Sequence, residues 1–132
     1  MPVTIRKVSA TDSNAGLSGA EFTLQLTDAA GDNDWYAAQL ESTVSSNGYL
    51  VRKDNAGQGT SNVLYLPLGK YALTETKAPV GYNKLSSAIT FEVTAKGVEK
   101  YTDSVYGKSA TTMPENHVVP LLVGNSTGVE LP

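Results

Sequence analysis

The chain has 132 residues, 40% of them hydrophobic, and its 10 Lys and Arg against 13 Asp and Glu give a formal net charge of -3. This length and hydrophobic content fit one folded domain with its own core and exclude a disordered chain. The absence of cysteine excludes disulfides and thiolate chemistry. The absence of a basic stripe argues against a nucleic-acid partner. No apolar run is long enough to insert into a membrane.

Short stretches rich in Val, Ile, Thr, Tyr and Leu alternate along the chain with clusters of Gly, Asn, Asp and Ser. This texture is typical of β-strands separated by turns, and no window has a convincing helical period. The sequence therefore predicts an all-β fold, a single antiparallel β-sandwich. The expected strands are Val3–Val8, Glu21–Leu26, Trp35–Leu40, Tyr49–Lys53, Asn62–Leu66, Lys70–Thr76, Ala88–Thr94 and Val118–Asn125. The expected turns are Asp12–Gly19, Asp28–Asp34, Ser45–Gly48, Asp54–Ser61 and Pro79–Asn83.

The polar stretch from Gly97 to Glu115 has little pattern and is predicted to be a long hairpin or a surface excursion. Long loops can carry a binding function, but a tolerated insertion is the plainer interpretation.

On three of the expected strands, alternate residues form an apolar row along one face, and this row, called here an apolar file, ends in a polar residue. Side chains two apart on a strand share a face, so each polar residue is carried onto the core face by its apolar neighbours. The files are Val3, Ile5 and Lys7; Tyr71, Leu73 and Glu75; and Leu121, Val123 and Asn125. By the same rule the side chains of Glu21 and Glu92 point outward, so Glu75 is the acid that is expected to point into the core.

A buried Lys or Glu costs several kcal/mol unless it is paired or neutralised. Because burial disfavours both charges, a proton can pass from Lys7 to Glu75 and leave a nucleophilic amine beside a protonated acid. That acid can donate to the carbonyl oxygen of Asn125, and loss of ammonia would then leave a Lys7–Asn125 amide. Two simpler arrangements also fit: a buried Lys7–Glu75 ion pair with Asn125 satisfying the strand end, or a Lys7 side chain that snorkels to solvent. Face alternation alone does not decide among them.

The residues around this trio resemble a known family. The run Leu66–Tyr82, LPLGKYALTETKAPVGY, is similar to the E-box of CnaB-type domains in Gram-positive pilins and adhesins. The segments Ile5–Val8 and Gly16–Leu24 look like that family's first-strand Lys and second-strand signature. The ending Val123–Pro132 is similar to the last strand of a wall-proximal pilin domain, which runs into a sorting signal.

The resemblance implies a reversed immunoglobulin-like sandwich, here with long loop insertions, and an intramolecular isopeptide bond. By motif, Lys7 is the amine donor, Asn125 the acyl partner and Glu75 the catalytic acid. Gly124, directly before Asn125, is a position where a bulge could shift the face of Asn125. No cofactor is implied.

From the resemblance we expect residues 1–132 to be one CnaB-like domain, the C-terminal wall-proximal module of a larger cell-wall-anchored surface protein. Its start, MPVTIRKV, lacks the features of a signal peptide, so we expect it to begin an excised piece. The partners expected are neighbouring domains or pilin subunits, with sortase acting on the parent protein and a host ligand as a further possibility. We expect no external substrate: the protein would react once, with itself.

The alternative function is a ligand-binding β-sandwich, an adhesin domain whose loops near Trp35 and Tyr106 contact a host glycan or matrix protein. For Trp35 itself the core is the commoner place. His117 is the single histidine, so a multi-histidine metal site is excluded. The acidic cluster Asp28–Asp34 lacks the spacing of an EF-hand loop and is predicted to be a turn. Lys77 is predicted to be a solvated charge.

Overall fold

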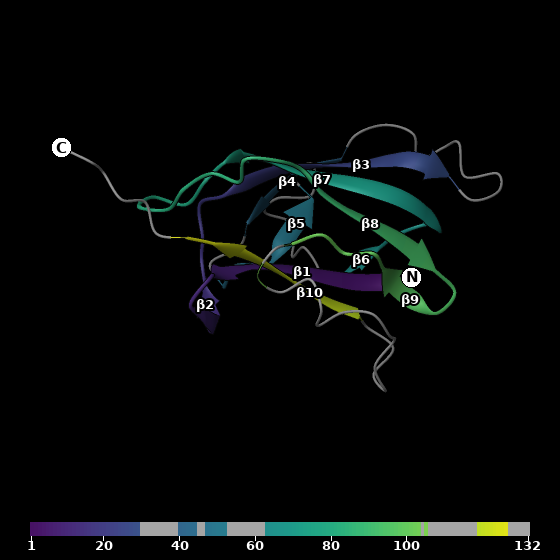
Figure 1. Cartoon of the computed structure of the whole chain (residues 1–132), viewed down its shortest axis with the longest axis horizontal. Helices are drawn as coiled ribbons and strands as arrows, with labels where there is room; N and C mark the ends of the chain where they lie inside the picture. Colours follow the sequence, from purple (N-terminus) through teal and green to yellow (C-terminus); the bar gives the residue numbers. More distant parts are fainter. Residues whose placement is uncertain (30–39, 45–46, 53–62, 104, 106–118, 127–132) are drawn as a thin grey trace.

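The computed structural model describes residues 1–29, 40–44, 47–52, 63–103, 105 and 119–126, and in this part of the chain all regular structure is β-strand (Figure 1). No helix in these ranges is long and apolar enough to cross a membrane. The strands are β1 Pro2–Ser9, β2 Asp12–Gly16, β3 Glu21–Ala29, β4 Leu40–Val44, β5 Leu50–Arg52, β6 Leu64–Tyr65, β7 Gly69–Lys77, β8 Ile89–Thr94, β9 Gly97–Glu99 and β10 Val119–Asn125.

The strands form two sheets. One has the order β10-β1-β2, with β6 also paired to β1, and the other has the order β5-β4-β3-β7-β8-β9. Strands β1 and β10 pair in parallel, with Lys7 opposite Val123 and Ser9 opposite Asn125. The other strand pairs are antiparallel. The fold therefore places the first and last strands side by side, running in the same direction (Figure 1).

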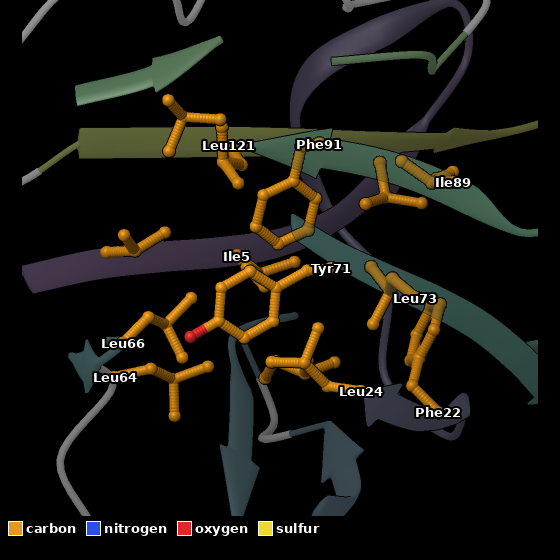
Figure 2. Packing of buried hydrophobic residues seen from close by; sticks show 14 of the residues in the cluster. Ile5, Phe22, Leu24, Leu64, Leu66, Tyr71, Leu73, Ile89, Phe91 and Leu121 are labelled. Atoms are coloured by element: carbon orange, nitrogen blue, oxygen red, sulfur yellow. The ribbon is translucent and has the colours of Figure 1, made fainter. Parts of the chain in front are cut away.

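The core lies between the sheets and is built from the alternate residues of each strand. Its centre is a stack of Tyr71 on Phe91, whose ring centroids are 5.3 Å apart (Figure 2). Tyr101 packs edge-on against Phe91. The hydroxyl of Tyr71 donates to the carbonyl of Pro67 at 2.6 Å, so this buried polar atom is satisfied. Burial of these rings fixes which side chains of β7 and β8 point into the core, because a register slip of one residue would turn every side chain to the other face.

The sandwich expected from the sequence is confirmed, and seven of the eight expected strands overlap an observed strand, although Asn62–Leu66 does so only at Leu64–Tyr65. The expected strand Trp35–Leu40 lies outside the described residues except for Leu40. One expectation was wrong: Asp12–Gly16, expected within a turn, is β2. Gly97–Glu99, in the stretch expected to be a long hairpin or a surface excursion, is β9, and β4 continues to Val44, where no strand was expected. Strands β2 and β9 are short, and each is held by pairing with a longer neighbour, β1 and β8 respectively.

Candidate functional site

Lys7, Glu75 and Asn125 are all buried between the sheets, with exposed fractions of 0%, 2% and 0%. Lys7 and Asn125 come from the neighbouring strands β1 and β10, and Glu75 comes from β7 in the opposite sheet. The register of β1 and β10 is unbroken from Val3 to Ser9, so Gly124 introduces no bulge and Asn125 keeps the face of Val123. Each residue thus takes the place that its apolar file dictates.

The backbone of Lys7 is fixed on both sides. Its N–H donates to the carbonyl of Gly48 at 2.7 Å, and its carbonyl accepts from the N–H of Leu17 at 2.8 Å. Gly48 has φ +91°, and a Cβ at this position would lie 2.5 Å from the carbonyl oxygen of Lys7. The close approach therefore requires glycine.

The ammonium group of Lys7 donates to the carbonyl of Val123 at 2.6 Å and to the carbonyl of Val8 at 3.3 Å. Lys7 makes no ion pair with another described residue, so neither a direct Lys7–Glu75 ion pair nor a snorkelling lysine is observed. Burial lowers the pKa of Lys7 from 10.5 to about 8, against the opposing attraction of Glu75 and of Asp103. At pH 7 about a tenth of such an amine is neutral, roughly 300-fold more than for an ordinary lysine.

The amide nitrogen of Asn125 is held by two acceptors. Nδ2 donates to Oε1 of Glu75 at 3.0 Å and to the carbonyl of Asn83 at 2.6 Å. Asn83 also donates its N–H to the carbonyl of Ser126 at 2.9 Å, so its backbone makes two hydrogen bonds to the end of β10. These contacts fix the orientation of the amide, with its nitrogen toward Glu75.

Glu75 Oε1 also accepts from the N–H of Leu85 at 2.9 Å. In the part of the chain that the structure describes, two buried side-chain oxygens have no hydrogen-bond partner, Oε2 of Glu75 and Oδ1 of Asn125. A carboxylic acid and an amide can form a cyclic pair in which the acid accepts from the amide N–H and donates to the amide carbonyl. The observed bond from Nδ2 to Oε1 is one half of that pair, and the two unpartnered oxygens are the atoms of the other half.

The site thus combines a buried amine with a lowered pKa, an oriented primary amide and a carboxyl group in contact with that amide. This is the set of groups that amide exchange requires: a nucleophile, an acyl carbon and an acid. Within the described residues no cluster of metal-ligating side chains is found.

Sequence reasoning named these three residues but missed three others. Asn83 and Leu85 contribute through their backbones, which no residue type reveals. Asp103, within the stretch expected to be a surface excursion or hairpin, is 7% exposed. Lys77 is exposed as expected, and the proposed ligand contacts Trp35 and Tyr106, like His117, lie outside the described residues.

Comparison with known proteins gives a family match and several structural neighbours. Residues 1–106 match the model of the SpaA prealbumin-like fold domain. No curated protein matches the chain. The backbone protein of the group B streptococcus pilus 2b is similar over 99% of this chain and 42% of its own, with 25% identity and a TM-score of 0.56.

A C-terminal fragment of the pilus adhesin SpaC from Lactobacillus rhamnosus GG is similar over 100% of this chain and 47% of its own, with 25% identity and a TM-score of 0.56. BcpA, the major pilin subunit of Bacillus cereus, has the same fold at 17% identity and a TM-score of 0.55, and the match covers 96% of this chain and 30% of that one. This chain spans less than half the length of each of these proteins.

Proposed function

The chain belongs to the SpaA family of prealbumin-like fold domains, and we propose that it is a structural pilin domain held closed by an amide bond between Lys7 and Asn125. The single observation that supports this bond best is the full burial of the Lys7 amine in the same core as a buried hydrogen bond between the Asn125 amide and the Glu75 carboxyl group. A lysine ammonium at 0% exposure is costly for a domain to keep. Conversion to a neutral amide removes that cost.

The reaction needs no other molecule. Neutral Nζ of Lys7 attacks Cγ of Asn125, while protonated Glu75 donates from Oε2 to Oδ1 and stabilises the charge that develops there. A proton from the attacking nitrogen passes through Glu75 to Nδ2, the Cγ–Nδ2 bond breaks, and ammonia leaves. Glu75 recovers its proton from Oδ1 as the carbonyl reforms. The fold holds the reactants together, so proximity replaces an external enzyme.

Intact mass of the purified protein tests the proposal. The wild-type protein should be lighter than its sequence by the mass of one ammonia. Lys7→Ala and Glu75→Gln should each have the full mass of their sequences while remaining folded by circular dichroism. The matched controls are Lys77→Ala and Glu92→Gln, which change the same residue types on the outer surface and should keep the loss of ammonia. A full-mass wild-type protein, or a Glu75→Gln variant that still loses ammonia, would overturn the assignment.

The relatives of the chain support a proposal for where the domain acts. Similar domains occur in pilus backbone and adhesin proteins, and this chain covers part of such a protein. We propose that it sits outside the cell in a cell-wall-anchored surface protein, where its partners are neighbouring domains or pilin subunits and where sortase acts on the parent protein. It has no external substrate in this account, because its one reaction consumes its own side chains.

A further inference from the structure

Asp103 is a buried acid that the reaction above does not use. In the described part of the chain the buried charged side chains are those of Lys7, Glu75 and Asp103. If the acid of Glu75 is engaged with the amide of Asn125, a different group must compensate the positive charge of Lys7 before it loses its proton. Asp103 is the remaining buried group with the right charge.

The backbone turns Asp103 inward by an unusual conformation. In β9 the side chain of Val98 is buried, so regular alternation would bury Lys100 and Thr102 and expose Asp103. Lys100 instead has φ +54°, the one non-glycine residue with positive φ among those described. After it, Tyr101 and Asp103 are buried and Thr102 is exposed. Left-handed φ at a lysine is unfavourable, and such outliers concentrate at functional positions.

The segment that follows Lys100 is fixed to both sheets beside the site. Thr102 donates its N–H to the carbonyl of Thr90 at 3.1 Å, and its Oγ1 accepts from the N–H of Thr90 at 2.8 Å. The hydroxyl of Tyr101 donates to the carbonyl of Leu122 at 2.8 Å. Leu122 directly precedes Val123, whose carbonyl accepts from Lys7. Asp103 therefore directly follows a support that is bonded to β8 and to β10, the strand whose Val123 carbonyl accepts from Lys7.

A pocket of about 190 Å³ adjoins this support. Its wall includes Leu85, Ser86, Ser87, Thr102 and Asp103. Leu85 donates its backbone N–H to Glu75, so the segment at this wall contacts the acid of the site. Most of the residues that line the pocket are polar, and Asp103 is among them. Lys7, Glu75 and Asn125 do not line it and stay buried between the sheets.

We propose that Asp103 controls when amide formation begins: its buried carboxylate holds Lys7 in the ammonium form in the freshly folded chain, until the proton leaves to solvent, which reaches Asp103 through this pocket. The inference rests on the proposed function. The step balances, because Lys7 loses one proton to solvent and becomes the neutral amine, and the later loss of ammonia completes the exchange. In the folded chain the titratable groups that act on Lys7 are Glu75 from β7 and Asp103, and both oppose the effect of burial. Burial raises the pKa of Tyr101, and the negative charge of Asp103 raises it further.

The test compares the pH dependence of bond formation in the wild-type protein and in Asp103→Asn. Chain purified unfolded in denaturant, and shown by intact mass to be unlinked, is diluted into buffers between pH 5.5 and 9, and loss of ammonia is followed over time. Asp103→Asn removes the charge and keeps the shape, so the midpoint of its pH–rate profile should move down by about half a unit or more. Asp28→Asn, which removes an exposed charge at the end of β3, should leave the midpoint unchanged.

A purely structural role of Asp103 would change the rate equally at every pH and leave the midpoint in place, which would overturn the inference. A wild-type protein that never loses ammonia would overturn the proposed function instead, so the two failures are distinguishable. If Asp103→Asn does not fold, the same question is put to unlinked Asn125→Ala. There the carboxyl carbon of Asp103, followed by NMR, should show a step in chemical shift as Lys7 titrates near pH 8. Absence of the step would contradict the inference.

Discussion

Lys7 shows how one residue can make a fold reactive. Its side chain is fully buried, and its ammonium group contacts backbone carbonyls of its own strand and of the neighbouring strand β10. Backbone carbonyls solvate a charge less well than water does, so burial favours the neutral amine. Lys7 lies opposite Val123, two residues before Asn125, so a neutral amine here is a nucleophile on the strand that pairs with the strand of the amide.

The lowered pKa of Lys7 makes the stability of an unlinked variant depend on pH. In Asn125→Ala the amine cannot be consumed, and its folded pKa of about 8 lies below the value of 10.5 expected for the unfolded chain. Between these values the unfolded state binds the extra proton, so the free energy of unfolding should rise as pH increases from 8 to 10, by about 2 kcal/mol. Urea unfolding at pH 7, 8, 9 and 10 measures this.

The control is the double variant Lys7→Met/Asn125→Ala, which lacks the titrating amine and should show no such rise. An Asn125→Ala protein whose stability falls or stays level relative to this control between pH 8 and 10 would contradict a buried, easily deprotonated Lys7.

At the scale of elements, the site depends on how β1 is held. On one side β1 pairs with β10 along most of its length, and on the other side it contacts β6, the backbone of Gly48 and β2 in turn. The contact with Gly48 lies at Lys7 itself. This loop contact therefore sets the position of the reactive lysine.

Gly48→Ala should misplace Lys7. The new methyl group would meet the Lys7 carbonyl and would occupy a left-handed backbone conformation, which together should cost about 1–3 kcal/mol. Bond formation, measured by the rate of ammonia loss after refolding, should slow at least about tenfold. Gly81→Ala is the matched control, because Gly81 has φ +85° but open space around it. Equal rates in the two variants would show that the contact with Lys7 is unimportant.

The sequence predicted the three reacting residues because strand alternation is a local rule, and the apolar files around Lys7, Glu75 and Asn125 obey it. It missed β2 because Asp12–Gly16 is polar and exposed for most of its length and consists of turn-forming residue types. It missed the burial of Asp103 because the left-handed conformation of Lys100 resets the alternation, and nothing in a lysine predicts that conformation. It missed Asn83 and Leu85 because a backbone contact depends on where the chain returns in space.

At the scale of the whole molecule, the proposed bond joins neighbouring parallel strands near their C-terminal ends. The start of β1 and the end of β10 lie at opposite ends of this pair (Figure 1). Tension applied between these points would pass along β1 to Lys7, cross the amide to Asn125 and leave the chain there. Most of the chain between Val8 and Gly124 would carry no load, so the sheets would not be sheared.

The same bond closes nearly the whole chain into one loop. By analogy with a disulfide closing a loop of this size, it should stabilise the fold by about 4–5 kcal/mol. Glu75→Gln, which leaves the chain unlinked, should therefore melt about 15 °C below the wild-type protein. Calorimetry measures the difference, with Glu92→Gln as the control that should melt near the wild type. Equal melting temperatures for the wild type and Glu75→Gln would contradict a stabilising crosslink.

The most direct measurement is tandem mass spectrometry of a tryptic digest of the unfolded wild-type protein. An unlinked chain is cleaved after Lys7, and Asn125 is released in the peptide that follows Lys108. A linked Lys7 cannot be cleaved, so the account predicts a branched peptide in which residues 7–52 and 109–132 are joined between Lys7 and Asn125, one ammonia lighter than the sum of its parts. Separate peptides 8–52 and 109–132, with Asn125 unmodified, would contradict it.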